Sequence, residues 1–341
     1  MAEQLQQMTG GGEEVFLTGA SGFVGSHMLR ALLAAQYRVR ALVRPGSRPL
    51  PPLDWCTTVW GDILRPGDLV QHMADCRYLI HVAALYSFSP DMHKKMYETN
   101  VQGCAGLLEA AHLAGIERAV VTSSSSTVGP SHGGRSATED DWDVEADSSV
   151  YHLSKLQQAR VALAAQIPVV LVLPTAPVGP GDWKPTPTGK MIVDFMRGRI
   201  FATLGGGLNV VAVEDVARAH VLALQYGHPR ERYLVGGENF TLSELWERLA
   251  QICGRKAPTV RIPYRLAFGF GLADELRCQF FRKGKGGLSA PLIPLEGVRM
   301  ARHYMYASSS KAQSELGYEA TSVNAALERA VRWYRDNGYA T

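Results

Sequence analysis

The fold is decided near the amino end of the chain by the stretch Val15-Phe-Leu-Thr-Gly19-Ala-Ser-Gly22-Phe-Val-Gly25. The apolar run Val15–Thr18 predicts a strand, and the residues from Phe23 to about Ala35 predict a helix. Three glycines spaced by three allow a tight turn, close backbone approach and close helix packing, and the helix amides face an anionic group. We therefore expect a dinucleotide pyrophosphate on Gly19, Ser21, Gly22, Phe23, Val24 and Gly25.

The same alternation of strands and helices continues through the first half of the chain. Further short apolar strands are predicted at Val39–Val43, Leu79–Ala83, Ala119–Ser123 and Val169–Leu173. Helices are predicted near Asn100–Leu113 and Tyr151–Ala165. All-apolar strands separated by helices are typical of a parallel sheet covered on both faces. With right-handed crossovers, this pattern predicts a doubly wound α/β fold of the Rossmann type.

The pattern loosens after Pro174, which indicates a second, smaller unit. We expect a flexible arm at 1–13, a nucleotide-binding domain at 14–180 with returns near 210–235, a substrate lobe at 181–205 and 240–310, and a helical segment at 311–341. The capping box Thr241–Glu244 predicts a helix to about Cys253, residues 254–305 look irregular, and Val323–Asn337 predicts a final helix.

Composition narrows the class of protein. The formal net charge of +3 on 341 residues gives no basic footprint for nucleic acid. Five scattered cysteines without ligand spacing predict free thiols, no disulfide framework and no metal site. No signal-peptide core and no apolar run of about 20 residues is present, so a soluble, cytoplasmic protein without a transmembrane segment is expected.

The choice of dinucleotide depends on the end of the second strand. A carboxylate about 20 residues after the glycines would hold a ribose 2′-hydroxyl. This chain has Arg44 there, which suits a 2′-phosphate and favours NADP(H) over NAD(H), although a solvated surface arginine is the alternative. Asp62 and Ile63 end the third strand and are expected near the adenine, unless Gly61-Asp62 is only a turn.

Tyr151-His-Leu-Ser-Lys155 places a phenol and an ammonium on one face of a helix. A nearby lysine favours the phenolate, so we expect a lowered tyrosine pKa suited to general acid/base catalysis. Lys155 is also expected to hold the nicotinamide ribose. The run Val121–Ser126 offers a hydroxyl for the substrate oxygen, but spacing leaves open which serine provides it. An exposed helical pair beside a serine turn is the alternative.

Together with His81-Val-Ala-Ala84 and Asn100, these motifs resemble the extended short-chain dehydrogenase/reductases from about Val15 to Tyr339. More narrowly, the segments 177–189, 233–239 and 296–300 are similar to the branch called hopanoid-associated sugar epimerases, which is related to dihydroflavonol 4-reductases. The resemblance implies that Ser124 is catalytic and that the Asn100 backbone supports a proton-relay water. It also places Ala83, Ala84 and Pro174 on the cofactor, and implies a homodimer through a four-helix face.

The chain departs from the sugar-nucleotide epimerases of that family. They carry Arg-Tyr-Phe-Asn after the strand that here reads Val169–Leu173, where this chain has Pro174-Thr-Ala-Pro177, which is closer to the reductase pattern. They also carry an arginine before the motif that here reads Val213-Glu-Asp215. No arginine precedes this motif within Gly206–Ala212, although a diphosphate needs charge-assisted donors. Net reduction of a carbonyl, or oxidation of a secondary alcohol, is therefore favoured.

Substrate contacts are expected from Tyr86, Ser124, Thr175 and Lys184. The loop 86–88 and the apolar segment 264–281, followed by Arg282-Lys-Gly-Lys285, would suit a small, lipid-like or polycyclic substrate and weak membrane-surface contact. A lobe core followed by a solvated loop is the alternative, and the acidic run 139–147 reads as a solvated loop. An NAD-dependent sugar-nucleotide epimerase or dehydratase and a non-enzymatic NADP(H)-binding regulator remain as other functions.

Overall fold

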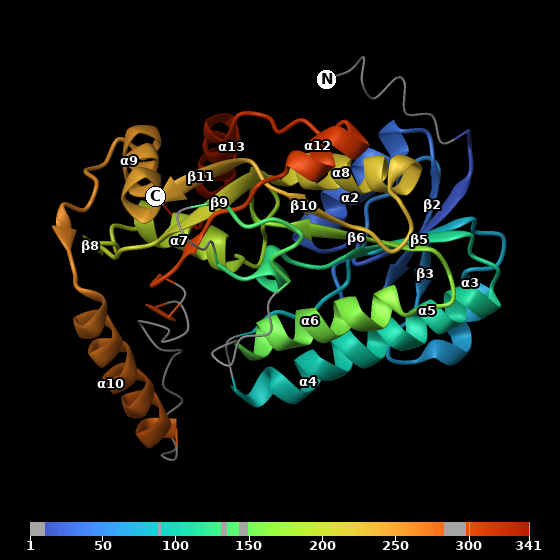
Figure 1. Cartoon of the computed structure of the whole chain (residues 1–341), viewed down its shortest axis with the longest axis horizontal. Coiled ribbons are helices and arrows are strands. Elements are labelled where there is room, and N and C mark those ends of the chain that lie inside the picture. Colours follow the sequence, from blue (N-terminus) through green and yellow to red (C-terminus); the bar gives the residue numbers. More distant parts are fainter. Residues whose placement is uncertain are drawn as a thin grey trace.

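The core of the computed structural model is a seven-stranded sheet in the order β10-β6-β5-β4-β1-β2-β3 (Figure 1). The structure describes residues 11–87, 90–130, 135–142, 149–282, 298–299 and 301–340. Every neighbouring pair in this sheet is parallel, which confirms the predicted doubly wound α/β fold. The strands are β1 (Glu14–Thr18), β2 (Arg38–Val43), β3 (Cys56–Trp60), β4 (Tyr78–His81), β5 (Arg118–Thr122), β6 (Val169–Pro174) and β10 (Arg232–Val235).

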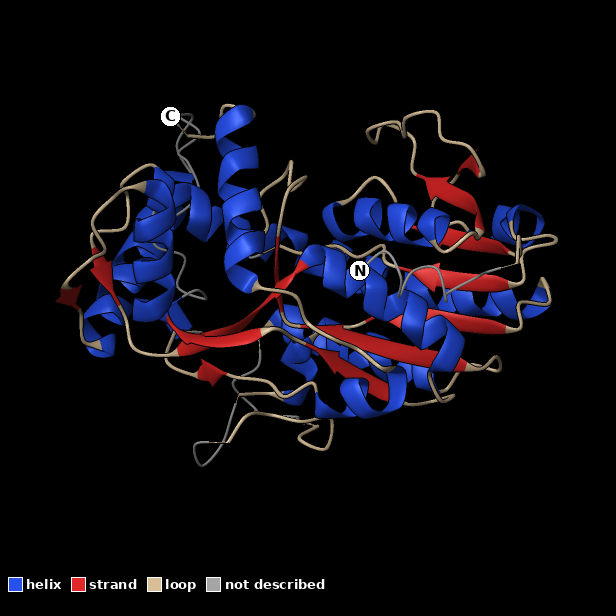
Figure 2. Ribbon diagram, turned by 90° about the horizontal axis from the view of Figure 1, so that it is seen from above, coloured by secondary structure: helices blue, strands red, loops and turns tan. Residues whose placement is uncertain are grey.

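Helices cover both faces of this sheet (Figures 1 and 2). One face carries α2 (Phe23–Ala34), α8 (Val213–Tyr226) and α12 (Ser310–Leu316). The other carries α3 (Leu69–His72), α5 (Gly103–Leu113) and α6 (Val150–Leu163), with α4 (His93–Tyr97) at its edge. Successive side chains of a strand point to opposite faces, so Val120 enters the first core and Val121 the second. Short turns complete this layer at η1 (Pro66–Asp68), η2 (Pro90–Met92), the π-helix η3 (Glu98–Gln102) and η4 (Ser125–Val128).

A smaller lobe continues from the carboxyl end of β6. Strand β7 (Ala176–Val178) pairs with β9 (Gly207–Ala212), which also pairs with β11 (Glu238–Thr241) and β13 (Tyr304–Met305). The helices α7 (Pro187–Met196), α9 (Leu242–Cys253) and α13 (Val323–Asp336) close a third core with this sheet. The expected segment 311–341 is therefore divided, because α12 packs on the large sheet and α13 packs in the lobe.

Two sequence-based expectations are wrong within the described residues. Residues 254–305 were expected to be irregular, but they include β12 (Val260–Arg261), which pairs with β8 (Ala202–Thr203), and the helix α10 (Tyr264–Arg282). The acidic run 139–147 was expected to be a solvated loop, but Glu139 is buried and its Oε1 accepts a hydrogen bond from Leu234 N at 2.6 Å. Residues 143–147 of that run lie outside the described part of the chain.

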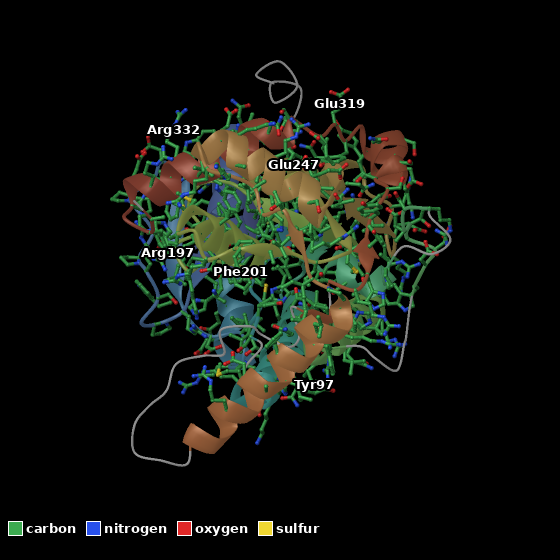
Figure 3. All side chains as sticks on the ribbon, turned by 90° about the vertical axis from the view of Figure 1, so that its left-hand side faces the viewer. Tyr97, Arg197, Phe201, Glu247, Glu319 and Arg332 are labelled. Atoms are coloured by element: carbon green, nitrogen blue, oxygen red, sulfur yellow. The ribbon has the colours of Figure 1, made fainter. Side chains whose placement is uncertain are left out.

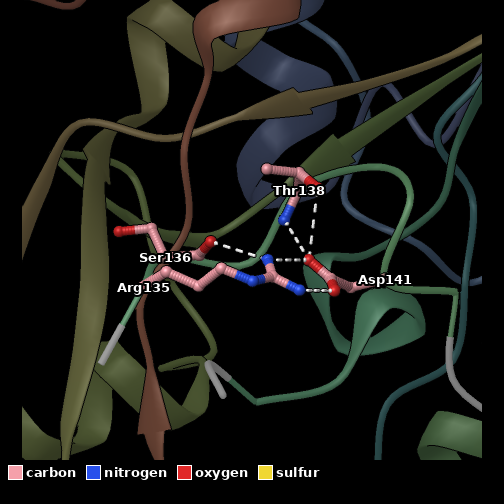
Figure 4. Close-up of polar contacts among 4 residues, drawn as sticks. All are labelled: Arg135, Ser136, Thr138 and Asp141. Atoms are coloured by element: carbon pink, nitrogen blue, oxygen red, sulfur yellow. Dashed lines mark hydrogen bonds and ion pairs between the residues drawn. The ribbon is translucent and has the colours of Figure 1, made fainter. Parts of the chain in front are cut away.

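The segment around Glu139 is held by its own polar contacts (Figure 4). Asp141 accepts from the Arg135 guanidinium and, at 2.8 Å, from Thr138 N. The arginine holds the pKa of the Asp141 carboxyl well below its usual range. These contacts explain how a buried carboxylate can cover the edge strand β10, whose amide would otherwise lack a partner.

Candidate active site

The glycine turn lies where the strand order reverses, between β1 and β4. Gly19 has φ +81, and a Cβ there would lie 2.7 Å from Ala83 N, at the end of β4. A Cβ on Gly25 would lie 1.9 Å from Gly19 O. Both glycines are therefore required for the backbone to pack this closely, as the sequence predicts. In an open α/β sheet, this reversal point is where ligands bind.

The first turn of α2 is open to an anion. Its N-cap, Gly22, provides no side-chain cap, and the first turn contains no acidic residue. The Gly22 amide is used by Gly19 O at 2.9 Å, but the next amides, at Phe23 and Val24, have no partner within the helix. Partial positive charge at this helix start and the close-packed glycines fit a dinucleotide pyrophosphate.

Arg44 and Asp62 follow the adjacent strands β2 and β3, whose last residues pair Val43 with Trp60. Arg44 is exposed and makes no ion pair within the described residues. One Asp62 oxygen accepts a hydrogen bond from Leu64 N at 3.0 Å and so closes a turn. This contact fits the alternative that Gly61-Asp62 is only a turn. Ile63 is buried.

Tyr151 lies on the first turn of α6, which Ser149 caps by accepting a hydrogen bond from His152 N at 3.1 Å. The Tyr151 phenol hydrogen-bonds Ser124, whose Oγ also accepts from Ser126 N at 3.2 Å. Burial raises the pKa of Tyr151 to about 12. The expected lowering by Lys155 is therefore wrong for this geometry, and the phenol is neutral at physiological pH.

Lys155 is buried with neutral acceptors around it. Its Nζ donates to Thr122 O at 3.0 Å and to Gln158 Oε1 at 2.8 Å. Burial lowers the pKa of Lys155 to about 8. Burial raises the pKa of the nearby Cys104 thiol to about 12. His81 stays neutral beside this group, because burial and the Lys155 charge lower its pKa to about 3.

Asn100 connects the loop after β4 to α6. It is fully buried in the π-helix η3; its Oδ1 accepts from Leu85 N at 2.7 Å, and its Nδ2 donates to Leu85 O at 2.9 Å and Ser154 Oγ at 3.1 Å. The loop so held places the Tyr86 ring 4.3 Å from the Tyr151 ring, edge to face. π-helical turns are frequent at functional sites, and the proton-relay role of the Asn100 backbone stays a prediction.

The other predicted substrate and cofactor residues are described by their burial and by their contacts outside the Ser124–Tyr151–Lys155 group. Thr175 Oγ donates to Asn209 Oδ1 at 2.8 Å, and the same oxygen accepts from Gly237 N at 2.9 Å, so Thr175 belongs to a structural network. Lys184 is exposed, and Pro174 is the buried last residue of β6. Ala84, also exposed, follows Ala83 after β4. Phe88 lies outside the described residues.

Several groups at this site escaped the sequence-based reasoning. Gln158 stands three residues after Lys155, a spacing that puts both on one helix face and would have identified it. The Ser123 and Ser126 hydroxyls are buried without a partner in the described part of the chain. Buried hydroxyls without partners on both sides of Ser124 fit a ligand that supplies the missing hydrogen bonds.

The comparisons with known proteins agree with this architecture. Residues 15–236 match the family described as "NAD dependent epimerase/dehydratase family". A protein of Synechocystis sp. named provisionally as a dihydroflavonol 4-reductase is 39% identical over 336 residues, covering 95% of each chain. Sterol demethylase protein B of Methylococcus capsulatus is 32% identical and covers 94% of this chain and 98% of its own. The crystal structure of gox2253 superposes with a TM-score of 0.83 at 35% identity, covering 96% of this chain and all of that one.

Proposed function

Because the chain belongs to the NAD dependent epimerase/dehydratase family, we propose that it is an NADP(H)-dependent oxidoreductase that reduces a carbonyl or oxidises a secondary alcohol. One observation carries the proposal: a neutral, half-buried phenol, Tyr151, hydrogen-bonds Ser124 one helical turn from the buried ammonium of Lys155. A neutral phenol can give its proton to a carbonyl oxygen, which is what reduction requires.

The roles of the protein groups follow from their contacts. A bound nicotinamide cofactor supplies the hydride. Ser124 holds the substrate oxygen by a hydrogen bond, and Tyr151 donates its proton to that oxygen. Lys155 has three donors, of which Thr122 O and Gln158 Oε1 take two. The third is left for the nicotinamide ribose.

The preference for NADP(H) rests on Arg44. The side chain is exposed at the carboxyl end of β2, in the position where a doubly wound fold meets the adenosine ribose. It has no carboxylate partner within the described residues, so its donors are available to a 2′-phosphate. The carboxylate of Asp62, by contrast, is partly engaged by Leu64 N.

We propose a lipid-like or polycyclic substrate, with Tyr86 as part of its binding wall. The Tyr86 ring lies directly against Tyr151, so it can line the space beside the reacting oxygen. Two of the relatives carry names that refer to sterol and dihydroflavonol chemistry, and both compounds are polycyclic. The half-buried Thr175 and the exposed Lys184 remain candidates for further contacts with the substrate.

We also propose a cytoplasmic homodimer through the α5–α6 face, where Leu113 and Leu153 are exposed.

A screen of sterol-type ketones, flavonoid-type ketones and sugar nucleotides, read by NADPH consumption, tests the function. We expect turnover with a polycyclic ketone and a lower KM for NADPH than for NADH. Equal KM values would contradict the cofactor preference. Turnover of sugar nucleotides alone, with NAD extracted from the purified protein, would indicate an epimerase or dehydratase. Tight NADPH binding without any turnover would indicate a regulator.

A further inference from the structure

The lobe ends in an exposed apolar surface, which we call the lobe tip and define as residues 197–203 and 255–270. Phe201 is 74% exposed, Val260 is 59% exposed, and the pairing of Ala202 with Val260 brings them to one edge. Figure 3 looks onto this end of the molecule and shows Phe201 and Arg197 above the projecting helix α10. The tip therefore carries large apolar side chains at the end of the molecule farthest from the β2–β3 edge (Figure 1).

The first half of helix α10 exposes two large apolar side chains. Leu266 and Phe270 are one turn apart and are 58% and 63% exposed, whereas the small residues Ala267 and Gly271 are buried. A helix that packs on a core does the reverse, burying its large apolar residues. Within the described residues, this side of α10 therefore exposes apolar area that its residue types would favour burying.

Basic side chains surround these apolar residues. The tip contains six, all exposed: Arg197, Arg199, Arg255, Lys256, Arg261 and Arg265. No aspartate or glutamate occurs within the two segments of the tip. Asp194, just before the tip, pairs with Arg199. Glu247 lies on α9, on the far side of Phe201 from α10 (Figure 3).

We propose that the lobe tip docks onto an anionic lipid surface, inserting Phe201, Leu266 and Phe270 between lipid headgroups. Aromatic and aliphatic side chains on one side and arginines around them are what an interfacial helix needs to bind such a surface. An acidic protein surface fits the tip less well as a partner, because the exposed apolar side chains lie on a projecting helix and at a strand edge. This inference deepens the proposed function, because a lipid-like substrate would be taken from the surface on which the enzyme rests.

Co-sedimentation of the full chain with vesicles tests the inference. We expect pelleting with vesicles that contain phosphatidylglycerol and little with phosphatidylcholine alone. Arg261→Gln with Arg265→Gln should weaken binding by about thirty-fold, since each basic residue near the surface contributes about 1 kcal/mol. Phe201→Ser with Phe270→Ser should abolish pelleting. The matched control is Tyr226→Ser, an exposed aromatic on α8 outside the tip, which should pellet as the wild type does.

Absence of pelleting on anionic vesicles would overturn the inference, as would equal pelleting of the wild type and both double variants. NADPH binding by every variant checks that the fold is intact. The two proposals can fail separately. If the protein reduces a ketone with NADPH but does not bind vesicles, only the proposed membrane contact is wrong. Vesicle binding without turnover of any carbonyl removes only the proposed function.

Discussion

Gln158 Oε1 accepts a hydrogen bond from Lys155 Nζ at 2.8 Å, deep beneath the proposed nicotinamide position. Both residues are buried, and the other acceptor of the ammonium is a neutral carbonyl, Thr122 O. Burial lowers the pKa of Lys155 to about 8, and the neighbouring Cys104 works against that shift. Hydrogen bonds from the ammonium to neutral acceptors also favour its charged form. Gln158 therefore helps to hold the ammonium in place and favours its charged form.

Substitutions at Gln158 should move the pH at which Lys155 loses its charge. Gln158→Leu removes an acceptor, lowers the lysine pKa and should make NADPH affinity fall at a lower pH than in the wild type. Gln158→Glu adds a negative charge beside the ammonium and should raise the lysine pKa. NADPH affinity should then fall at a pH about one to three units higher than in the wild type. NADPH titrations by fluorescence from about pH 6 to pH 10 measure both effects.

The control for these variants is Gln225→Leu, a half-buried glutamine on α8 that bonds Tyr37 instead. It should leave the pH dependence of NADPH binding unchanged. A merely structural role for Gln158 predicts weaker binding at every pH with no shift. Opposite shifts in the leucine and glutamate variants are therefore the decisive result, and shifts in one direction would contradict the assignment.

Removing the phenol hydroxyl should abolish proton donation while leaving the site packed. In Tyr151→Phe the ring can still contact Tyr86, so NADPH affinity should be unchanged and kcat should fall by about 10²–10⁴. The rate is measured on the ketone identified by the substrate screen. Tyr97→Phe, on the exposed tyrosine of α4, serves as the control. A near-normal kcat for Tyr151→Phe would refute the role of this residue.

The first half of the fold was predictable because its residues follow the period of the elements they form. The all-apolar run Val169–Leu173 predicts a buried strand, and β6 extends it by one residue. Helix α10 was not predictable in this way. Leu266, Phe270 and Leu272 are exposed rather than buried, and Gly269 and Gly271 weaken the helical pattern.

The site was predictable as far as sequence spacing determines it. The glycine turn follows from local chain geometry, and Tyr151 and Lys155 share a helix face whatever surrounds them. The Tyr151 pKa does not follow from spacing, since it depends on burial and on the hydrogen bond with Ser124. Glu139 was misjudged for a related reason: its partner, Leu234, is 95 residues away in the sequence.

Arg44→Ala should reduce affinity for NADPH without changing affinity for NADH. Loss of a charged hydrogen bond costs about 1.5–3 kcal/mol, which corresponds to a roughly ten- to hundred-fold increase in the Kd of NADPH. The matched control is Arg38→Ala, an exposed arginine at the opposite end of the same strand. If both cofactors weaken equally in Arg44→Ala, the side chain does not contact a 2′-phosphate.

Gly25→Ala should disturb the turn that the pyrophosphate site needs. Its Cβ would lie 1.9 Å from Gly19 O, so β1 and α2 must move apart. We expect a loss of about 1–3 kcal/mol in the free energy of unfolding together with lost NADPH binding. Gly67→Ala provides the control, because a Cβ there has no atom within 4 Å. Wild-type NADPH affinity in Gly25→Ala would show that the close packing is not required.

Buried histidines should make the protein sensitive to acid. Burial lowers the pKa of His27, and the shift is large for two others that are fully buried. Burial lowers the pKa of His81 to about 3 and that of His220 to about 4, whereas both titrate near 6.5 when unfolded. Below about pH 6.5 the unfolded state therefore binds more protons, so their contribution is complete above that pH and is lost as the pH falls toward 4. With two such groups, the free energy of unfolding should fall by about 2 kcal/mol per pH unit near pH 5.5.

Urea unfolding between about pH 7 and pH 5 measures this slope, and a substitution separates it from the titration of carboxyl groups. His220 Nδ1 lies 2.8 Å from Val216 O and its Nε2 lies 2.8 Å from Thr122 Oγ, contacts that a glutamine amide can partly replace. His220→Gln should therefore retain the fold and lose about half of the slope. His112→Gln, at an exposed histidine of α5, should retain the full slope. Burial raises the pKa of the Glu139 carboxyl, which works in the opposite direction, so the difference between the two variants, rather than the wild-type slope alone, reports the histidine contribution.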